Sequence, residues 1–317
     1  MVQYRKGSAT MKNYFTYPSK DNQTNIHAIE WKPSCQVKAV VQIIHGMVEF
    51  MDRYDRFANF LTDHGYYVIG HDQLGHGQSV KDENAYGYFA KNGNECLIED
   101  IHTLQAMTQV RFPDVPYFIL GHSMGSFLCQ EYIEKYGENL SGAILMGTGY
   151  YSPATLKSAK ALCLSIAQTK GWEYRSQVLG RVVLGSANKK FEPARTKNDW
   201  LSKDEGIVDA YNAHPWNNFD FTVNGYYTLF EAIEYAHRHS DDIPKDLPIL
   251  LMSGKDDPIG NFGLGVKRVY DLLKKENIQN VQFKLYEKDR HELLNETNYV
   301  QIQNDILHWF EDCMEES

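Results

Sequence analysis

The sequence predicts an α/β fold with a mostly parallel central sheet and helices on both of its faces. Two observations carry this prediction. Short, almost continuous apolar runs recur along the chain, and longer segments with helical spacing of apolar residues separate them. The chain has 317 residues, 43% of them hydrophobic, which is ample material for a large buried core.

The predicted strands are runs rich in β-branched and aromatic residues, typical of strands buried on both faces. They cover residues 39–46, 66–72, 117–123, 140–148, 248–254 and 281–287. Helical spacing follows or precedes each of them, over residues 54–61, 95–110, 123–136, 265–276 and 296–313. Strict alternation of strand and helix favours parallel pairing, because each helix returns the chain to the start of the next strand.

The stretch from residue 150 to 243 breaks this alternation. It has helical patterns at 153–169 and 226–239 but no strong apolar run, and it is too long for one structureless loop. We therefore expect a helical cap at 150–243 over a core formed by 1–149 and 244–317. Six aromatic residues fall within 215–230, where they either pack inside the cap or line an apolar pocket.

Composition excludes several classes of function. The net charge of −9 and the absence of a basic stripe argue against a nucleic-acid partner. Five scattered cysteines, none in a Cys-x-x-Cys pair, argue against a disulfide framework and a zinc site. We see no secretory signal and no apolar run long enough to span a bilayer, so we expect a cytoplasmic protein.

The pentapeptide Gly-His-Ser-Met-Gly at 121–125 lies directly between a predicted strand and a predicted helix. Such a sharp turn strains its central residue and leaves no room for side chains two positions away, which explains the two glycines. It presents the hydroxyl of Ser123 at the carboxyl edge of the sheet, where the amino terminus of a helix favours negative charge. Ser123 is therefore the predicted nucleophile.

A serine needs an adjacent base, and on this fold the acid and then the histidine follow the serine along the chain. Only His291 and His308 follow the last predicted strand, and His308 lies inside the terminal helix. His291, in the loop after that strand, is the predicted general base. Because its His-Glu-x-x segment lacks a second histidine, no metal site is expected there.

The acid is expected at the end of strand 248–254, where two carboxylates stand side by side. Asp257 precedes a proline, which restricts its backbone, and we predict that it orients His291. Asp256 is then solvated or ties down the loop. The oxyanion is expected to bind the backbone N–H of Met124, after the nucleophile, and of Met47, after an early central strand.

Taken together, these motifs resemble the α/β-hydrolase superfamily, and within it monoacylglycerol lipases, bacterial lysophospholipase-like enzymes and serine aminopeptidase-type hydrolases. The resemblance runs from about residue 25 to 312. The motifs that carry it are His45-Gly46-x-x-Glu49 with Arg53-Tyr54, Asp72-x-x-Gly75-His76-Gly77-x-Ser79, the pentapeptide at 121–125, Gly254-x-x-Asp257-Pro258 and Arg290-His291-Glu292.

The resemblance implies a cap after the sixth strand region and hydrolysis of carboxylic esters, without a cofactor, through an acyl-enzyme. It also implies that Glu49 and Arg53 hold the polar head of a glycerol-like substrate, although a simple ion pair is the alternative. Two residues depart from the family pattern: Phe50 stands where these lipases usually have histidine, and His214 where relatives often have aspartate. These departures concern the substrate rather than the chemistry.

We expect an ester hydrolase acting on monoacylglycerol- or lysophospholipid-like substrates. The alternatives are a proline-releasing aminopeptidase or a short-chain aryl esterase on the same scaffold, and acidic residues in the cap keep the former open. The partner is a small-molecule or lipid ester, and any transient membrane contact is expected through the cap. Oligomeric state cannot be read from the sequence.

Overall fold

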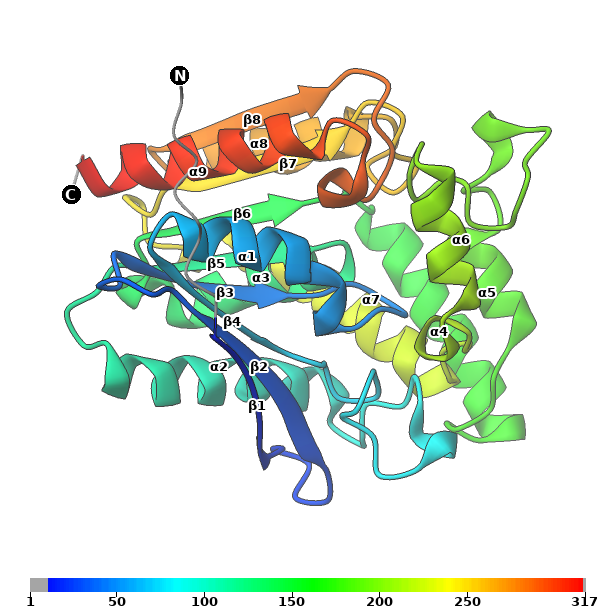
Figure 1. Ribbon diagram of the computed structural model, residues 1–317. Helices are drawn as coiled ribbons and strands as arrows, with labels where there is room; N and C mark the ends of the chain where they lie inside the picture. The colour runs from blue at the N-terminus through cyan, green and yellow to red at the C-terminus, as the bar shows by residue number, and fades with distance from the viewer. Residues whose placement is uncertain (1–10, 316–317) are drawn as a thin grey trace.

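The apolar runs of the sequence form the strands of one twisted sheet in the computed structural model, which describes residues 11–315 (Figure 1). The order of its eight strands is β1-β2-β4-β3-β5-β6-β7-β8, and all pairs from β4 to β8 are parallel. The parallel strands are β3 (Ala39–Ile44), β4 (Tyr66–His71), β5 (Tyr117–His122), β6 (Gly142–Met146), β7 (Ile249–Gly254) and β8 (Val281–Tyr286). The predicted α/β class and these strands are confirmed.

Two strands escaped prediction. β1 (Met11–Pro18) and β2 (Asn25–Lys32) form a hairpin that pairs antiparallel with the edge of the sheet at β4. β1 is largely exposed, so it alternates polar and aromatic residues and lacks the continuous apolar run of a central strand. Residues 1–10 and 316–317, which the sequence assigns to the core, lie outside the described residues.

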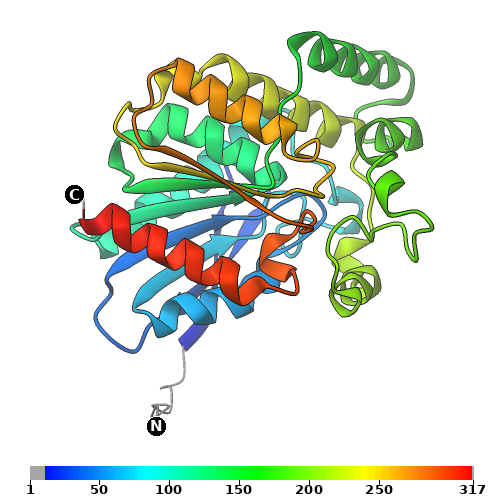
Figure 2. The same ribbon diagram turned by 90° about the horizontal axis from the view of Figure 1, so that it is seen from above.

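Helices cover both faces of the sheet, as Figure 2 shows from above. α1 (Asp55–Asp63) and α9 (Tyr299–Glu315) pack on one face, where Phe57, Leu61 and Phe310 are buried. The other face carries α2 (Gly93–Arg111), α3 (Met124–Tyr136) and α8 (Leu264–Lys275). Within residues 11–315, none of the helices combines the length and the apolar character needed to cross a membrane.

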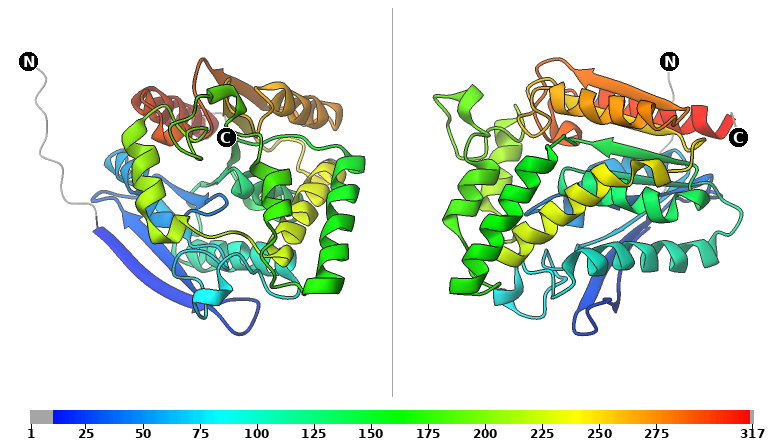
Figure 3. Two further views of the ribbon diagram at one scale, coloured as in Figure 1. Left: turned by 90° about the vertical axis from the view of Figure 1, so that its right-hand side faces the viewer. Right: turned by 180° about the vertical axis from the view of Figure 1, so that it is seen from behind.

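The segment between β6 and β7 is helical, and it lies beyond the carboxyl ends of the strands (Figures 1 and 3). Its helices are α4 (Pro153–Lys170), α5 (Gln177–Leu184), α6 (Glu205–Ala213) and α7 (Val223–Arg238). α7 packs on α4 and also on α2 and α3 of the core. We keep residues 150–243 as the proposed limits of the cap.

Short 3-10 turns connect these elements. Two of them flank the site described below, η1 (Met51–Tyr54) after β3 and η7 (Leu293–Asn295) after β8. The others are η2 (Glu83–Ala85), η3 (Gly137–Asn139), η4 (Lys189–Phe191), η5 (Pro215–Asn217) and η6 (Ser240–Asp242).

Candidate active site

Ser123 is the single residue between β5 and α3, and its backbone is strained, with φ of 54° and ψ of −119°. The turn is fixed by the Ser123 N–H, which donates to the carbonyl of Met146 on the next strand at 2.9 Å. A Cβ on Gly121 would collide with the Gly125 carbonyl, and one on Gly125 with the carbonyl of Ile44. Only glycine fits at both positions, as the sequence predicted.

Asp257 and His291, 34 residues apart, meet at the carboxyl edge of the sheet. His291 donates from Nδ1 to Asp257 Oδ2 at 3.0 Å, and both side chains are buried. The carboxylate is held in place by Ser253 Oγ at 3.0 Å and by the N–H of Ile259 at 2.8 Å. This arrangement fixes the tautomer of the imidazole, with Nε2 left as the proton acceptor.

The ring of His291 lies between two other rings, those of Trp200 and His122, each with its centroid 4.9 Å away. Its Nε2 is buried and has no hydrogen-bond partner within the described part of the chain. Ser123 and His291 both line one cavity. The structure thus brings a partly exposed serine and an unpaired base to the same cavity.

Met47 and Met124 line this cavity as well. The N–H of Met124 belongs to the first turn of α3, where helical N–H groups have no partner inside the helix. Gly46 allows the loop of Met47 to approach the nucleophile, because a Cβ there would lie 3.0 Å from Ser123 Cβ and 2.7 Å from Glu49 Oε1. The two candidate oxyanion donors therefore flank Ser123.

The loop that carries Met47 is strained at its next residue. Val48 has φ of 56°, which is unfavourable for a β-branched side chain. Its N–H donates to His76 Nε2 at 3.1 Å, and its carbonyl accepts from the Tyr211 hydroxyl at 3.0 Å. Burial lowers the pKa of His76 to about 3, which keeps this ring neutral and able to accept.

The cavity has a volume of about 470 Å³ and lies between the core and the helices of the insertion. Most of its wall is apolar. From the core and α4 the lining includes Phe127, Tyr151, Leu156 and Ala159; from α5 and α7 it includes Val183, Leu184, Tyr226, Leu229, Phe230 and Ile233. Of the aromatic segment 215–230, Phe219, Tyr226 and Phe230 line the cavity and Phe221 is packed in the core, so both expected roles occur.

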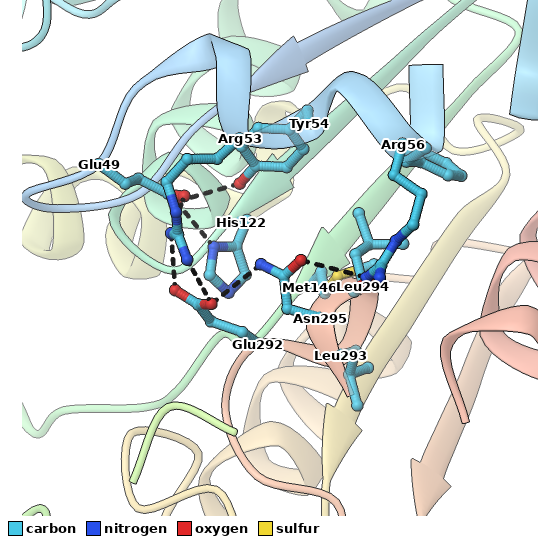
Figure 4. A pocket seen from close by; sticks show the side chains of 11 residues that line it. Glu49, Arg53, Tyr54, Arg56, His122, Met146, Glu292, Leu293, Leu294 and Asn295 are labelled. Carbon is cyan, nitrogen blue, oxygen red and sulfur yellow. Dashed lines mark hydrogen bonds and ion pairs between the residues drawn. The ribbon is translucent and has the colours of Figure 1, made fainter. Parts of the chain in front are cut away.

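A second, much smaller pocket of about 20 Å³ lies behind the site (Figure 4). Arg53 lines this pocket only, whereas Glu49, His122 and Glu292 line both. Arg53 binds Glu292 with two hydrogen bonds of 2.8 and 2.7 Å and Glu49 with one of 2.9 Å. The substrate-binding role that the resemblance implies for Glu49 and Arg53 stays a prediction, because both side chains are bound to other protein groups.

The electrostatics of this group follow from burial and pairing. Burial would raise the pKa of Glu49, but the hydrogen bond from His122 and the charges of His122 and Arg53 hold it well below its usual range. Burial would lower the pKa of His122, yet Glu49 and Glu292 raise it. Glu49 is therefore favoured in its ionised form, beside the guanidinium of Arg53.

The alternative candidates for the catalytic acid and base, Asp256 and His308, lie outside the proposed triad. Asp256 pairs with Lys190 of the insertion at 2.5 Å, so it ties down its loop, and His308 is exposed on α9. Among residues 11–315 no three His, Cys, Asp or Glu side chains are grouped to hold a metal ion. Two residues that depart from the family pattern are in contact: the ring centroids of Phe50 and His214 are 4.4 Å apart, with the rings tilted by 33°.

Sequence reasoning missed two residues of the site, Trp200 and Glu292. Trp200 belongs to the insertion, and its carbonyl accepts from the His291 N–H at 3.4 Å. Glu292 pairs with Arg53, which lies 239 positions earlier. Their only signal in the sequence was the position of Glu292 next to the predicted base.

A serine strained between strand and helix, a buried Asp–His pair and an apolar cavity define the α/β-hydrolase class. The chain belongs to the family described as "Serine aminopeptidase, S33", whose sequence profile matches residues 35–298. It is a hydrolase of carboxylic esters, as its relatives are.

The similar proteins are lipases and esterases. Monoglyceride lipase of Mus musculus is 28% identical over 282 residues, which cover 88% of this chain and 82% of the mouse protein. A phospholipase of Bacillus subtilis is 25% identical and covers 84% of this chain and 92% of its own length. The crystal structure of a thermostable carboxyl esterase from Bacillus coagulans in complex with glycerol superimposes with a TM-score of 0.89 at 28% identity, covering 95% of this chain and 98% of the esterase.

Proposed function

We propose that this enzyme hydrolyses monoacylglycerol- or lysophospholipid-like esters through an acyl-enzyme on Ser123. The observation that carries the proposal is the apolar cavity of about 470 Å³ with Ser123 and the unpaired His291 Nε2 on its wall. An acyl chain fills such a cavity, while the polar head of the substrate reaches the charged side chains of the cavity wall. The similarity to monoglyceride lipases and to an esterase that binds glycerol supports the same substrate class.

In the proposed reaction Ser123 Oγ attacks the carbonyl carbon while His291 Nε2 takes its proton. The N–H groups of Met47 and Met124 bind the negatively charged oxygen. The ester C–O bond then breaks, and His291 returns the proton to the leaving alcohol. A water molecule deprotonated by His291 then attacks the acyl-enzyme, the bond from the acyl carbon to Ser123 Oγ breaks, and His291 returns the proton to Oγ as the fatty acid leaves. Asp257 stabilises the imidazolium in both steps.

The competing proposals are an aminopeptidase and a short-chain aryl esterase. A proline-releasing aminopeptidase needs a free carboxylate in the cap to bind the substrate amine. Among the acidic residues of the cap, all of which the structure describes, only Asp220 lines the cavity. It shares the wall with Arg181 and Lys197. Because the cap gives the cavity wall more positive than negative side chains, the cavity favours an uncharged acyl chain over the ammonium group of a peptide substrate.

Turnover of four substrates by the purified enzyme separates these activities: 1-oleoylglycerol, oleoyl-lysophosphatidylcholine, p-nitrophenyl butyrate and proline p-nitroanilide. We expect the two oleoyl esters to have the highest kcat/KM and the anilide to be at least 100-fold slower. A faster anilide would identify an aminopeptidase, and a butyrate preference with negligible oleoyl turnover would identify a short-chain esterase.

We further propose that the cap touches lipid surfaces transiently. Residues 153–197 contain nine Lys and Arg against two Asp and Glu, a net charge of +7 in a chain of −9. The same segment exposes Trp172, Tyr174, Val178 and Val182, the last two 54% and 59% exposed on α5. α5 also lines the cavity, with Val182 itself among the lining residues, so a surface bound here lies next to the cavity.

Vesicle co-sedimentation tests this contact. Binding to phosphatidylglycerol vesicles should exceed binding to phosphatidylcholine vesicles, and V178D/V182D should abolish most of it. Equal, weak sedimentation with both lipids would refute the contact without touching the hydrolytic proposal. We keep a cytoplasmic location as a proposal, which the absence of a disulfide bond among residues 11–315 favours.

A further inference from the structure

Three loops that are far apart in the sequence must be held in register for the proposed reaction. The loop 45–49 carries Met47, the turn at 122–124 carries Ser123, and the loop 289–296 carries His291. Each loop also contributes one buried polar side chain within two residues of its proposed reacting group. These are Glu49, His122 and Glu292, with exposed fractions of 4%, 5% and 4%.

Arg53 and Glu49 link these three side chains into one network, most of which Figure 4 shows. Arg53 holds Glu292 with a bidentate pair and Glu49 with a third bond, so it joins the His291 loop to the Met47 loop. Glu49 Oε1 accepts from His122 Nδ1 at 3.0 Å, which joins both loops to the nucleophile turn. The same oxygen accepts the N–H of Gly46 at 2.5 Å, one residue before Met47.

The strain at Val48 explains why such a restraint is needed. A β-branched residue at φ of 56° is unfavourable and persists only where its surroundings enforce it. Val48 lies between Met47 and Glu49, so the bonds of Glu49 to Gly46, His122 and Arg53 hold both ends of the strained segment. Without them we expect the loop to relax and Met47 to move relative to Ser123.

We propose that Arg53, Glu49, Glu292 and His122 are positioning residues that hold the oxyanion loop, the nucleophile turn and the histidine loop in register, with Arg53 as the central link. The inference rests on the proposed function. It replaces the head-group role of Arg53 that the resemblance implies, because its guanidinium binds Glu49 and Glu292, packs on the ring of Tyr211 and lies outside the large cavity.

Arg53→Lys tests the proposal, since lysine keeps the charge but cannot bind both carboxylates in the same fork geometry. Two substrates with one acyl chain are compared, butyrylglycerol and p-nitrophenyl butyrate. A positioning role predicts a fall in kcat of about 10- to 100-fold on both esters with KM changed less than about 3-fold. A head-group role predicts a loss on the glyceryl ester alone, mainly in KM, and would overturn the proposal.

The rate of labelling by a fluorophosphonate supplies a readout that does not depend on either ester. It should fall by a similar factor in Arg53→Lys, whereas labelling at the wild-type rate would refute positioning. If the wild-type protein hydrolyses neither these two esters nor the oleoyl esters, the proposed substrate is wrong, but the labelling comparison still decides the role of Arg53. Arg111→Lys is the matched control, because Arg111 pairs with Glu30 far from the site and should keep wild-type rates.

Glu292→Gln is a second variant, which tests the proposal if Arg53→Lys fails to fold. Glutamine keeps one acceptor oxygen for Arg53, so we expect a milder loss of kcat, of about 3- to 10-fold, with the same loss on both esters. Thermal unfolding of each variant accompanies the kinetics. Failure of both variants to fold would make the network a stability element and contradict the positioning role.

Discussion

The two pockets that meet at Glu49, His122 and Glu292 are opposite in character. In the large cavity the proposed reacting groups are open to a ligand: His291 Nε2 has no partner within residues 11–315, and Ser123 is partly exposed. In the small pocket the charged groups are crowded, and Arg53, Glu49 and Glu292 are bound to one another. The reacting groups of the large cavity can bind a substrate, whereas the charged groups of the small pocket bind other protein groups.

This difference teaches how the molecule divides its work. Groups that react must have unsatisfied hydrogen-bonding capacity, which is tolerable only where a ligand will satisfy it. Groups that position others must be fully satisfied, because an unpaired buried charge destabilises the fold. Substitutions of the two kinds of group should therefore have different effects. Those in the large cavity should remove a reacting group, and those in the small pocket should misalign the reacting groups.

The largest effect is expected from Ser123→Ala, which removes the free hydroxyl of the large cavity. Hydrolysis of p-nitrophenyl butyrate should fall by at least about 10⁴-fold without loss of fold. The control is Ser165→Ala on the exposed side of α4, which should retain full activity. Retained turnover in pure Ser123→Ala would assign the nucleophile elsewhere.

Asp257→Asn should have the next largest effect, because an amide cannot stabilise the imidazolium and favours the wrong tautomer. We expect kcat to fall by about 10³-fold or more. Asp256→Asn makes the same change one residue earlier, where the carboxylate pairs only with Lys190, and should stay within about 3-fold of wild type. Equal effects of the two changes would remove Asp257 from the proposed triad.

Gly46→Ala probes the wall between the two pockets. The new methyl group would lie 2.7 Å from Glu49 Oε1 and 3.0 Å from Ser123 Cβ, so the loop of Met47 must shift. We expect kcat to fall by about 10- to 100-fold. At Gly206 an added Cβ meets only Asp204 Oδ1 at 3.3 Å, and Gly206→Ala should be neutral; full activity of Gly46→Ala would argue against the proposed oxyanion loop.

Glu134 on α3 extends the comparison to a buried carboxyl group that has no partner. It is 8% exposed, both of its oxygens are unpaired within residues 11–315, and burial, with the charges of Glu131 and Asp242, raises its pKa to about 10. The folded protein therefore keeps this group protonated at pH values where the unfolded chain ionises it. Stability is lost as the pH rises from the unfolded value toward the folded one.

Glu134→Gln should remove the loss of stability that the Glu134 carboxyl group causes as the pH rises. At pH 8 we expect the variant to be more stable by at least about 2 kcal/mol, and at pH 4 the two proteins should be nearly equal. Urea unfolding at both pH values measures the difference, and activity should not change. An increment that does not depend on pH would show that the group is ionised in the folded state.

The sequence was sufficient to predict the parallel strands and to single out Ser123, Asp257 and His291 as candidates, because buried strands and the sharp turn leave local patterns. β1 and β2 were missed because an exposed edge hairpin has no continuous apolar run. The bond between Arg53 and Glu292 leaves no local pattern, since it joins residues 239 positions apart. The same holds for Trp200, which reaches His291 only through the fold of the insertion.

Peptide mapping by mass spectrometry after a brief reaction with p-nitrophenyl butyrate at low pH tests the acyl-enzyme itself. Quenching in acid should leave a butyryl group on the peptide that contains Ser123, and the group should be absent from Ser123→Ala. A butyryl group on another side chain, or rapid turnover with no trapped adduct in the wild type or in Asp257→Asn, would contradict covalent catalysis by this serine.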